Sequence, residues 1–174
     1  MSAFIIAALT ADGFIARNET HFADWSSKED KRRFVELTKR AGVVVMGSRT
    51  FETIGKALPG RLNIVYTRSG KKYAGTETTN LPPPELLRGL ETRGYKEVAI
   101  CGGATIYTLF MRSGVVNKLY LTVEPLMFGA GVRLFNEPID VTLDLVSSKK
   151  TLGGAVFLEY RVPPTHLKAS NTKP

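Results

Sequence analysis

The sequence is poor in the residues that mark secreted, metal-binding or membrane proteins. It has one cysteine, Cys101, and two histidines, His21 and His166. One cysteine cannot form an intrachain disulfide, so nothing indicates an oxidising compartment, and two histidines exclude a histidine-rich metal site. The first apolar run, residues 4–9, is too short for a membrane span or a signal-peptide core. We therefore expect a cytoplasmic protein that holds no metal.

The composition fits one folded domain. The 174 residues are 43% hydrophobic and 23% charged, a balance typical of globular proteins, and this length suits one core better than two. The formal net charge of +8 attracts polyanions, which include nucleic acids, phosphorylated cofactors and carboxylate-bearing substrates. Many of the cations crowd one predicted helix, and we interpret most of them as solvated surface: Lys28, Lys31, Arg32, Arg33, Lys39 and Arg40.

Strand and helix patterns alternate along most of the chain. The sequence predicts strands over residues 4–9, 43–46, 62–67, 76–79, 97–101 and 118–123. It predicts helices over residues 26–40, 47–55, 83–94 and 102–111. This alternation favours a mostly parallel sheet that is covered by helices on both faces.

The last part of the chain departs from that alternation. Residues 140–149 and 155–162 flank Gly153 and Gly154, which is a hairpin signal. The predicted fold class is therefore three-layer α/β, with a central sheet of about eight strands that ends in an antiparallel hairpin. We expect residues 1–163 to form the domain and residues 164–174 to be a disordered tail. Since nothing in the pattern demands an oligomer, we expect a monomer.

The first helix carries an acid on an apolar face. At about 100° per residue, Asp30, Phe34, Leu37 and Ala41 lie within a narrow arc. A carboxylate in such surroundings is costly unless it is compensated. One interpretation is a first-turn acid beside a Ser27 cap; the other is a ligand site. The carboxylate oxygens would then accept two parallel N–H bonds from a cationic or amidine-like group, with Phe34 and Trp25 as apolar walls.

Two turns lead from predicted strands into predicted helices. They are Gly47-Ser48-Arg49-Thr50 and Gly102-Gly103-Ala104-Thr105. Ligands bind at the carboxyl ends of parallel strands, and the free N–H groups of helix N-termini favour phosphates. The two turns are therefore candidates for holding a pyrophosphate, with tight strand–helix packing as the alternative.

Two arginines lie at the same predicted edge of the sheet. Arg68 stands between Thr67 and Ser69 at the end of a strand, where it suits a second phosphate. Arg61 follows a Leu-Pro-Gly turn that would fix its backbone, and a fixed arginine suits a carboxylate. Each would otherwise be an ordinary surface arginine.

Taken together, these segments resemble the dihydrofolate reductase family. The most specific match is residues 46–65, MGSRTFETIGKALPGRLNIV. The residues Trp25, Asp30, Phe34 and Thr38 keep the family's relative spacing. Residues 102–107, GGATIY, are similar to the family's glycine pair and the start of the helix that follows it. The resemblance covers roughly residues 4 to 162. It implies the family's fold, an NADPH cofactor, and a cis peptide bond between Gly102 and Gly103.

The resemblance also implies a role for each matching residue. Asp30 would hold the pterin and support protonation of N5, and Trp25 and Thr122 would bond Asp30 directly or through water. Arg61 would take the carboxylate of the glutamate tail. The other substrate contacts would be Ile5, Phe34, Ile54 and Leu58. NADPH would be held by Ala8, Ile15, Gly47, Ser48, Arg49, Thr50, Thr67, Arg68, Ser69, Cys101, Gly102, Gly103, Ala104, Thr105, Ile106 and Tyr107.

Three functions remain open on the sequence. The first is reduction of dihydrofolate by hydride transfer to C6. The second is a riboflavin-pathway reductase of a ribosylaminopyrimidine phosphate, because residues 12–16, DGFIA, look more like that related enzyme. Arg61 argues against it, since that substrate has no glutamate tail. The third is a basic, non-catalytic protein that binds nucleic acid or a cofactor, but the chain lacks an interleaved aromatic and basic platform for nucleic acid. We expect a small-molecule substrate, no nucleic acid and no membrane.

Overall fold

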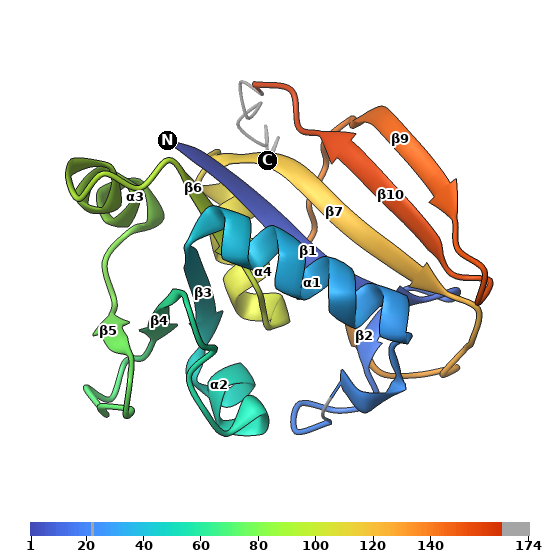
Figure 1. Ribbon diagram of the computed structural model, residues 1–174, viewed down its shortest axis with the longest axis horizontal. Helices are drawn as coiled ribbons and strands as arrows, with labels where there is room; N and C mark the ends of the chain where they lie inside the picture. Colours follow the sequence, from blue (N-terminus) through green and yellow to red (C-terminus); the bar gives the residue numbers. More distant parts are fainter. Residues whose placement is uncertain (22, 165–174) are drawn as a thin grey trace, which may run out of the picture.

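The computed structural model describes residues 1–21 and 23–164 and shows an α/β fold (Figure 1). Its helices are α1 (Lys28–Ala41), α2 (Ser48–Ile54), α3 (Pro83–Thr92) and α4 (Ala104–Arg112), with a short 3-10 helix η1 (Ala23–Trp25). Its strands are β1 (Ser2–Thr10), β2 (Phe14–Ala16), β3 (Val43–Gly47), β4 (Leu62–Tyr66), β5 (Glu77–Thr79), β6 (Glu97–Ile100), β7 (Val116–Glu124), β8 (Val132–Arg133), β9 (Asp144–Lys150) and β10 (Val156–Arg161).

The main sheet confirms the predicted fold class. It has eight strands in the order β5-β4-β3-β6-β1-β7-β10-β9. The first six are parallel, and β10 pairs antiparallel with both β7 and β9. In the sheet β6 lies between β3 and β1: from β1 the chain crosses through α1 to β3 on one face, and from β6 it crosses through α4 to β7 on the other face, in the opposite direction. Such a reversal of strand order opens a crevice at the carboxyl ends of the strands.

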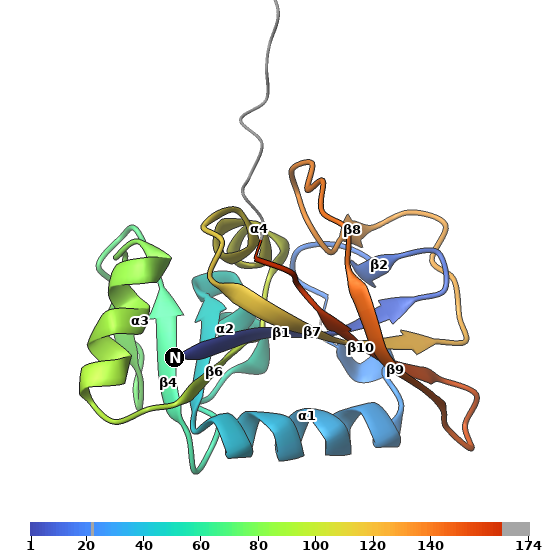
Figure 2. The same cartoon turned by 90° about the horizontal axis from the view of Figure 1, so that it is seen from above.

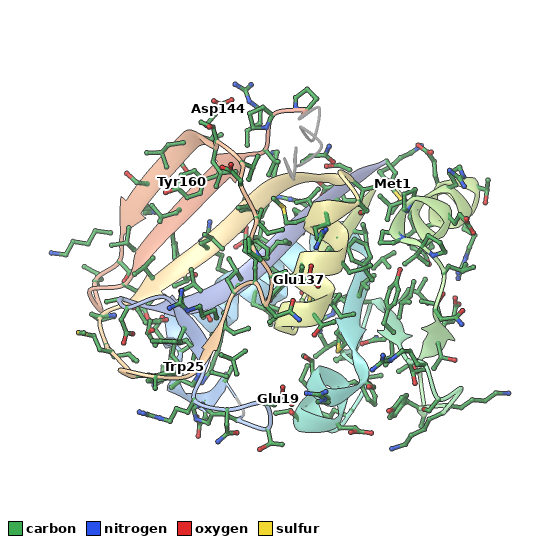
Figure 3. The ribbon with its side chains drawn as sticks, turned by 180° about the vertical axis from the view of Figure 1, so that it is seen from behind. Met1, Glu19, Trp25, Glu137, Asp144 and Tyr160 are labelled. Atoms are coloured by element: carbon green, nitrogen blue, oxygen red, sulfur yellow. The ribbon has the colours of Figure 1, made fainter. Side chains whose placement is uncertain are left out.

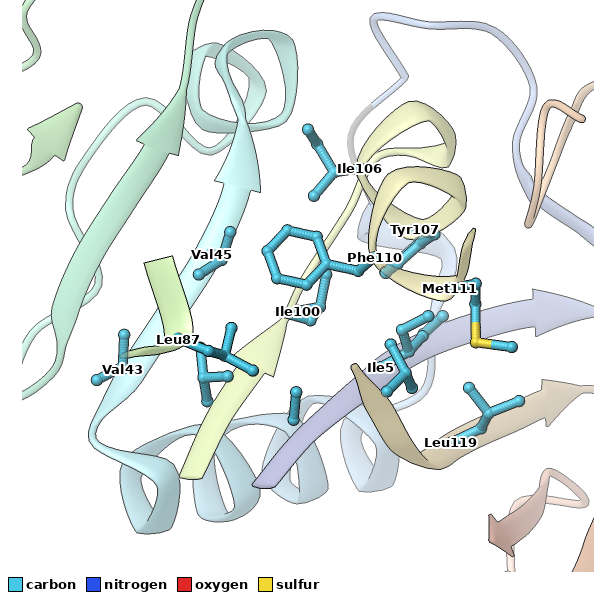
Figure 4. Close-up of a cluster of buried hydrophobic side chains, with 14 of the residues drawn as sticks. Ile5, Val43, Val45, Leu87, Ile100, Ile106, Tyr107, Phe110, Met111 and Leu119 are labelled. Carbon is cyan, nitrogen blue, oxygen red and sulfur yellow. The ribbon is translucent and has the colours of Figure 1, made fainter. Parts of the chain in front are cut away.

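Helices cover both faces of the sheet (Figure 2). Leu37 and Ala41 of α1 and Phe51 of α2 pack against one face. Leu90 of α3 and Phe110 of α4 pack against the other, where Figure 4 shows the α4 side chains over Ile5, Val45 and Ile100. The strands between these layers read as unbroken apolar runs because both of their faces are buried.

Two features of the fold were not predicted. A second, two-stranded sheet joins β2 to β8, and η1 precedes α1. Strands of two or three residues contain too few side chains to display a period of two. The predicted disordered tail covers residues 164–174, and all of it after Pro164 lies outside the described residues. Among the described helices, none combines the length and the apolar character that a membrane crossing requires.

Candidate functional site

A cavity of about 790 Å³ opens at the carboxyl ends of β1, β3, β4 and β6. It extends between the α1–α2 layer and the first turn of α4, and the segment between β2 and α1 forms part of its rim. This is the position where open parallel sheets bind ligands, and the volume falls in the range of small-molecule sites.

Asp30 lines this cavity from the first turn of α1 and is only 9% exposed. Its backbone N–H donates to Oγ of the N-cap Ser27 at 3.1 Å. The capping is therefore done by Ser27, which leaves the Asp30 carboxylate to face the cavity. Phe34, one turn later, lines the cavity beside it. Among the described residues, no side chain forms a hydrogen bond or ion pair with this carboxylate.

Trp25 and Thr122 were predicted to bond Asp30 directly or through water, and neither makes a direct hydrogen bond to it. Trp25 lines the cavity, but its Nε1 is buried and has no partner among the described residues. Its ring packs edge-on against Phe128, with 5.2 Å between the ring centroids. Thr122 is 2% exposed, lies on β7 beside Ala8 of β1, and does not line the cavity.

Arg61 lines the cavity and is held in place by the protein. Its Nη1 donates to Oγ1 of Thr38 at 2.7 Å, and its Nε donates to the Pro59 carbonyl at 3.1 Å. Burial lowers the pKa of Arg61, but an arginine stays charged in proteins. No carboxylate of the described residues forms an ion pair with it. A fixed cation without an acidic partner at a cavity wall is suited to an anionic group of a ligand.

The two predicted glycine turns meet on the opposite side of the cavity. The Gly47 N–H donates to the Gly102 carbonyl at 2.7 Å, and a methyl group at Gly103 would lie 3.3 Å from Oγ1 of Thr50. The Gly102–Gly103 peptide bond is cis, as predicted. Gly103 is the N-cap of α4 and has no side chain to bond the first N–H groups of that helix, so these groups are left for a ligand.

The floor between the two sides of the cavity is apolar and neutral. Burial raises the pKa of the Cys101 thiol to about 12 and raises that of Tyr107 well above its ordinary value. The Tyr107 hydroxyl donates to the Ile6 carbonyl at 2.8 Å. Both groups are therefore uncharged at neutral pH and supply a wall for a flat ring instead of a proton-transfer group.

Charged residues stand on the rim of the cavity beside the two glycine turns. Arg49, at the start of α2, forms an ion pair with Glu19 from the segment between β2 and α1, where Figure 3 shows Glu19 beside α2. Arg68 follows β4 and lines the same part of the cavity. Both arginines are exposed.

The cavity brings together most of the residues that the sequence singled out, including Ala8, Ile15, Ile54, Leu58 and Thr67. Three do not line it. Ser69 contacts Thr67 through a 3.0 Å hydroxyl pair, and Thr122 is described above. Ile5 is fully buried in the cluster under α4, while its neighbour Ile6 faces α1 and lines the cavity. The prediction of Ile5 as a substrate contact is therefore corrected to Ile6, the next residue of β1. The two differ because successive side chains of a strand point to opposite faces.

Sequence reasoning missed several residues of the cavity wall. Lys31 and Val35 of α1 line it, and each follows a predicted site residue by one position, so a wider helical arc would have included them. No local signal marked Asn80 or Val132, which the fold brings in from distant segments. The other unpredicted lining residues are Ala7, Ala16, Asn18, Glu19, His21, Ala23, Ser26, Thr53, Tyr66 and Leu109.

Comparisons with known proteins identify relatives of this chain in sequence and in fold. A family model described as dihydrofolate reductase matches residues 3–136. Dihydrofolate reductase type 3 of Salmonella typhimurium is 35% identical over 119 residues, which is 68% of each chain. A solved structure titled "Putative riboflavin biosynthesis protein", from Shewanella sp. PV-4, has a TM-score of 0.80 at 20% identity and covers 93% of this chain and 99% of its own. A dihydrofolate reductase of Enterococcus faecalis complexed with NADP(H) has a TM-score of 0.78 at 24% identity, covering 93% and 96%. The two structures share the fold.

Proposed function

The chain belongs to the dihydrofolate reductase family, and we propose that it reduces 7,8-dihydrofolate to 5,6,7,8-tetrahydrofolate with NADPH, by hydride transfer to C6 and protonation of N5. The observation that carries this proposal is the Asp30 carboxylate, which is 9% exposed and lines an apolar cavity without a side-chain partner among the described residues. A buried carboxylate in that state is stabilised by a ligand that brings paired N–H donors.

In this proposal Asp30 binds and orients the substrate ring. Its two oxygens accept the ring N–H and the exocyclic amino group, and its negative charge favours the protonated ring. Phe34 and Ile54 hold the ring from either side. Fixing two rings in a reactive alignment contributes about 7–11 kcal/mol to lowering a barrier, so positioning is the main work of these residues.

The opposite side of the cavity fits a dinucleotide. Adjacent glycine turns without side-chain caps let a pyrophosphate approach the backbone, and Thr50 and Thr105 offer hydroxyls beside them. Arg49 and Arg68 supply charge for further phosphates, and Ala8 and Ile15 leave room for a nicotinamide ring. When bound there, NADPH supplies the hydride.

Arg61 supports a folate over the riboflavin-pathway substrate. Its guanidinium is already anchored to Thr38 and Pro59, so little freedom is lost when it captures a carboxylate. The riboflavin-pathway substrate stays the rival to dihydrofolate, because the fold of this chain is about as similar to the Shewanella structure, with a TM-score of 0.80, as to the dihydrofolate reductase structure, with a TM-score of 0.78.

A spectrophotometric assay separates the two. The purified chain is mixed with NADPH, and the loss of its absorbance band is followed with dihydrofolate, with a ribosylaminopyrimidine phosphate, and with neither. We expect loss of the band with dihydrofolate alone and its arrest by methotrexate. Turnover of the pyrimidine and not of dihydrofolate would refute the proposal.

A further inference from the structure

Glu124 is a buried acid that the proposed function does not use. It is the last residue of β7, it is 3% exposed, and it does not line the cavity. Within residues 1–21 and 23–164, no cationic group forms an ion pair with it. A carboxylate buried without a cation is costly unless hydrogen bonds compensate it. The bonds that Glu124 accepts therefore indicate why it is there.

The Glu124 carboxylate accepts two hydrogen bonds from Ser27, the N-cap of α1, which lies beside the end of β7 (Figure 1). Its Oε1 accepts from the Ser27 N–H at 2.8 Å and from the Ser27 hydroxyl at 2.7 Å. The same hydroxyl oxygen accepts from the Asp30 N–H at 3.1 Å. A serine cap needs only its oxygen lone pair to stabilise a helix, so the bonds to Glu124 go beyond capping. They fix the backbone and the side chain of Ser27 together.

A second link to β7 lies on the other side of Asp30. Arg33 donates to the Leu121 carbonyl at 3.0 Å. The links from Ser27 and from Arg33 each stand three residues from Asp30 along the chain. Six helical residues rise about 9 Å, and three strand residues span about 10 Å. Because these lengths match, the two links hold the start of α1 at one register along β7, with Asp30 midway between them.

We propose that Glu124 is a positioning residue for Asp30: by holding Ser27, it fixes the first turn of α1 so that the Asp30 carboxylate keeps its orientation in the cavity. The inference rests on the proposed function, in which Asp30 orients the substrate ring. Glu124 acts on the ring only through Ser27 and Asp30, because it lies outside the cavity wall. A misplacement of about 1 Å can cost about 10²-fold in rate, so the length of the Glu124 side chain matters more than its charge.

The test separates the length of this side chain from its charge. Glu124→Gln keeps the length and the acceptor oxygen and removes the charge, whereas Glu124→Asp keeps the charge and shortens the side chain by one methylene. At saturating NADPH and dihydrofolate, we expect kcat to fall about tenfold in Glu124→Asp and by less than about threefold in Glu124→Gln. The dissociation constant of NADPH, measured by fluorescence titration, should stay the same in both, because the glycine turns lie on other elements.

Variants of Ser27 test whether Glu124 acts through the helix cap. Ser27→Ala removes the hydroxyl and should lower kcat about fivefold, and Ser27→Thr, which keeps the hydroxyl, should restore it. In the double variant Ser27→Ala/Glu124→Asp, kcat should be no lower than in the weaker of the two single variants, because both changes break the same link.

Asn117→Ala is the matched control. Asn117 lies near the other end of β7, and its Oδ1 accepts from the Ala3 N–H at 2.9 Å. This variant also deprives a backbone N–H of its side-chain acceptor, but away from the cavity. Thermal unfolding is measured for every variant. Asn117→Ala is expected to lower the unfolding temperature and to leave kcat unchanged.

The outcomes separate this inference from the proposed function. Equal kcat in Glu124→Asp and Glu124→Gln, or effects that multiply in the double variant, would overturn the inference while the proposed function stands. A loss of kcat in Asn117→Ala as large as in Glu124→Asp would also overturn it, because the loss would then follow stability alone. If the unaltered chain does not reduce dihydrofolate, the proposed function is wrong and the inference falls with it.

Discussion

Arg61 and Thr38 are joined by a 2.7 Å hydrogen bond from Nη1 to Oγ1, and the Thr38 hydroxyl in turn donates a hydrogen bond to the Phe34 carbonyl at 2.6 Å. Thr38 is fully buried. The Arg61 guanidinium at the cavity wall is therefore positioned through the backbone of α1, the same helix that carries Asp30. This relationship makes Thr38 a positioning residue.

Thr38→Val keeps the shape of the side chain and removes the hydroxyl that accepts the hydrogen bond from Arg61. We expect KM for dihydrofolate to rise about fivefold, the loss of one ordinary hydrogen bond, with kcat and the KM for NADPH unchanged. Thr92→Val is the matched control, because Thr92 makes the same kind of hydroxyl-to-carbonyl bond on α3, away from the cavity. An unchanged KM in Thr38→Val would show that Arg61 does not depend on Thr38.

Arg33 holds α1 against strands β7 and β10 of the main sheet. Its guanidinium donates to the carbonyls of Leu121 on β7 and Leu158 on β10, at 3.0 and 3.3 Å, and lies 4.5 Å from the Phe157 ring. Arg33→Ala should lower the free energy of unfolding by about 1–3 kcal/mol. Arg32→Ala, at an exposed neighbouring position, should change it by less than about 0.5 kcal/mol. Urea denaturation of both variants measures the difference, and equal values would contradict the account.

The buried thiol of Cys101 lowers the free energy of unfolding as pH rises in the alkaline range. Burial raises its pKa from an ordinary value of 9.0 to about 12. Between these values the unfolded chain has lost the thiol proton while the folded chain retains it, so the free energy of unfolding falls as pH rises, by up to about 1.4 kcal/mol per pH unit. Below the unfolded pKa the thiol contributes no slope.

Cys101→Ala should flatten this decline. Urea unfolding from about pH 8 to about pH 10 isolates the contribution, because the tyrosines of the chain titrate in both proteins and cancel in the comparison. Parallel slopes in the two proteins would mean that the thiol is not protected by burial.

Gly131 permits the small β2–β8 sheet. A methyl group at this position would lie 2.3 Å from the Ala16 carbonyl oxygen, so Gly131→Ala should destabilise the protein by about 1–3 kcal/mol. Gly89→Ala is the same substitution in the middle of α3, where the added methyl meets nothing within 4 Å. It should stabilise the protein by about 0.5–1 kcal/mol. Thermal unfolding of the two variants should shift in opposite directions.

The sequence predicted the parts of the fold and site that depend on local patterns. Buried strands and the turns after them placed Gly47–Thr50 and Gly102–Thr105 at one edge of the sheet, and helical periodicity placed Asp30 beside Phe34. It failed where a pattern is ambiguous. In an unbroken apolar run such as β1, nothing says which of Ile5 and Ile6 faces the cavity, because both faces are buried. Val132 reaches the cavity only through a two-residue strand, which has no signal of its own.

In the proposed function, Asp30 binds the ring that is reduced. The most direct measurement is the rate of dihydrofolate reduction by Asp30→Asn at saturating NADPH, beside Asp24→Asn, an exposed acid outside the cavity wall. The Ser27 cap uses only the backbone of residue 30, so Asp30→Asn should fold and bind NADPH normally. Its turnover should fall by about 10²–10⁴-fold, while Asp24→Asn keeps full activity. Near-normal turnover in Asp30→Asn would contradict the account.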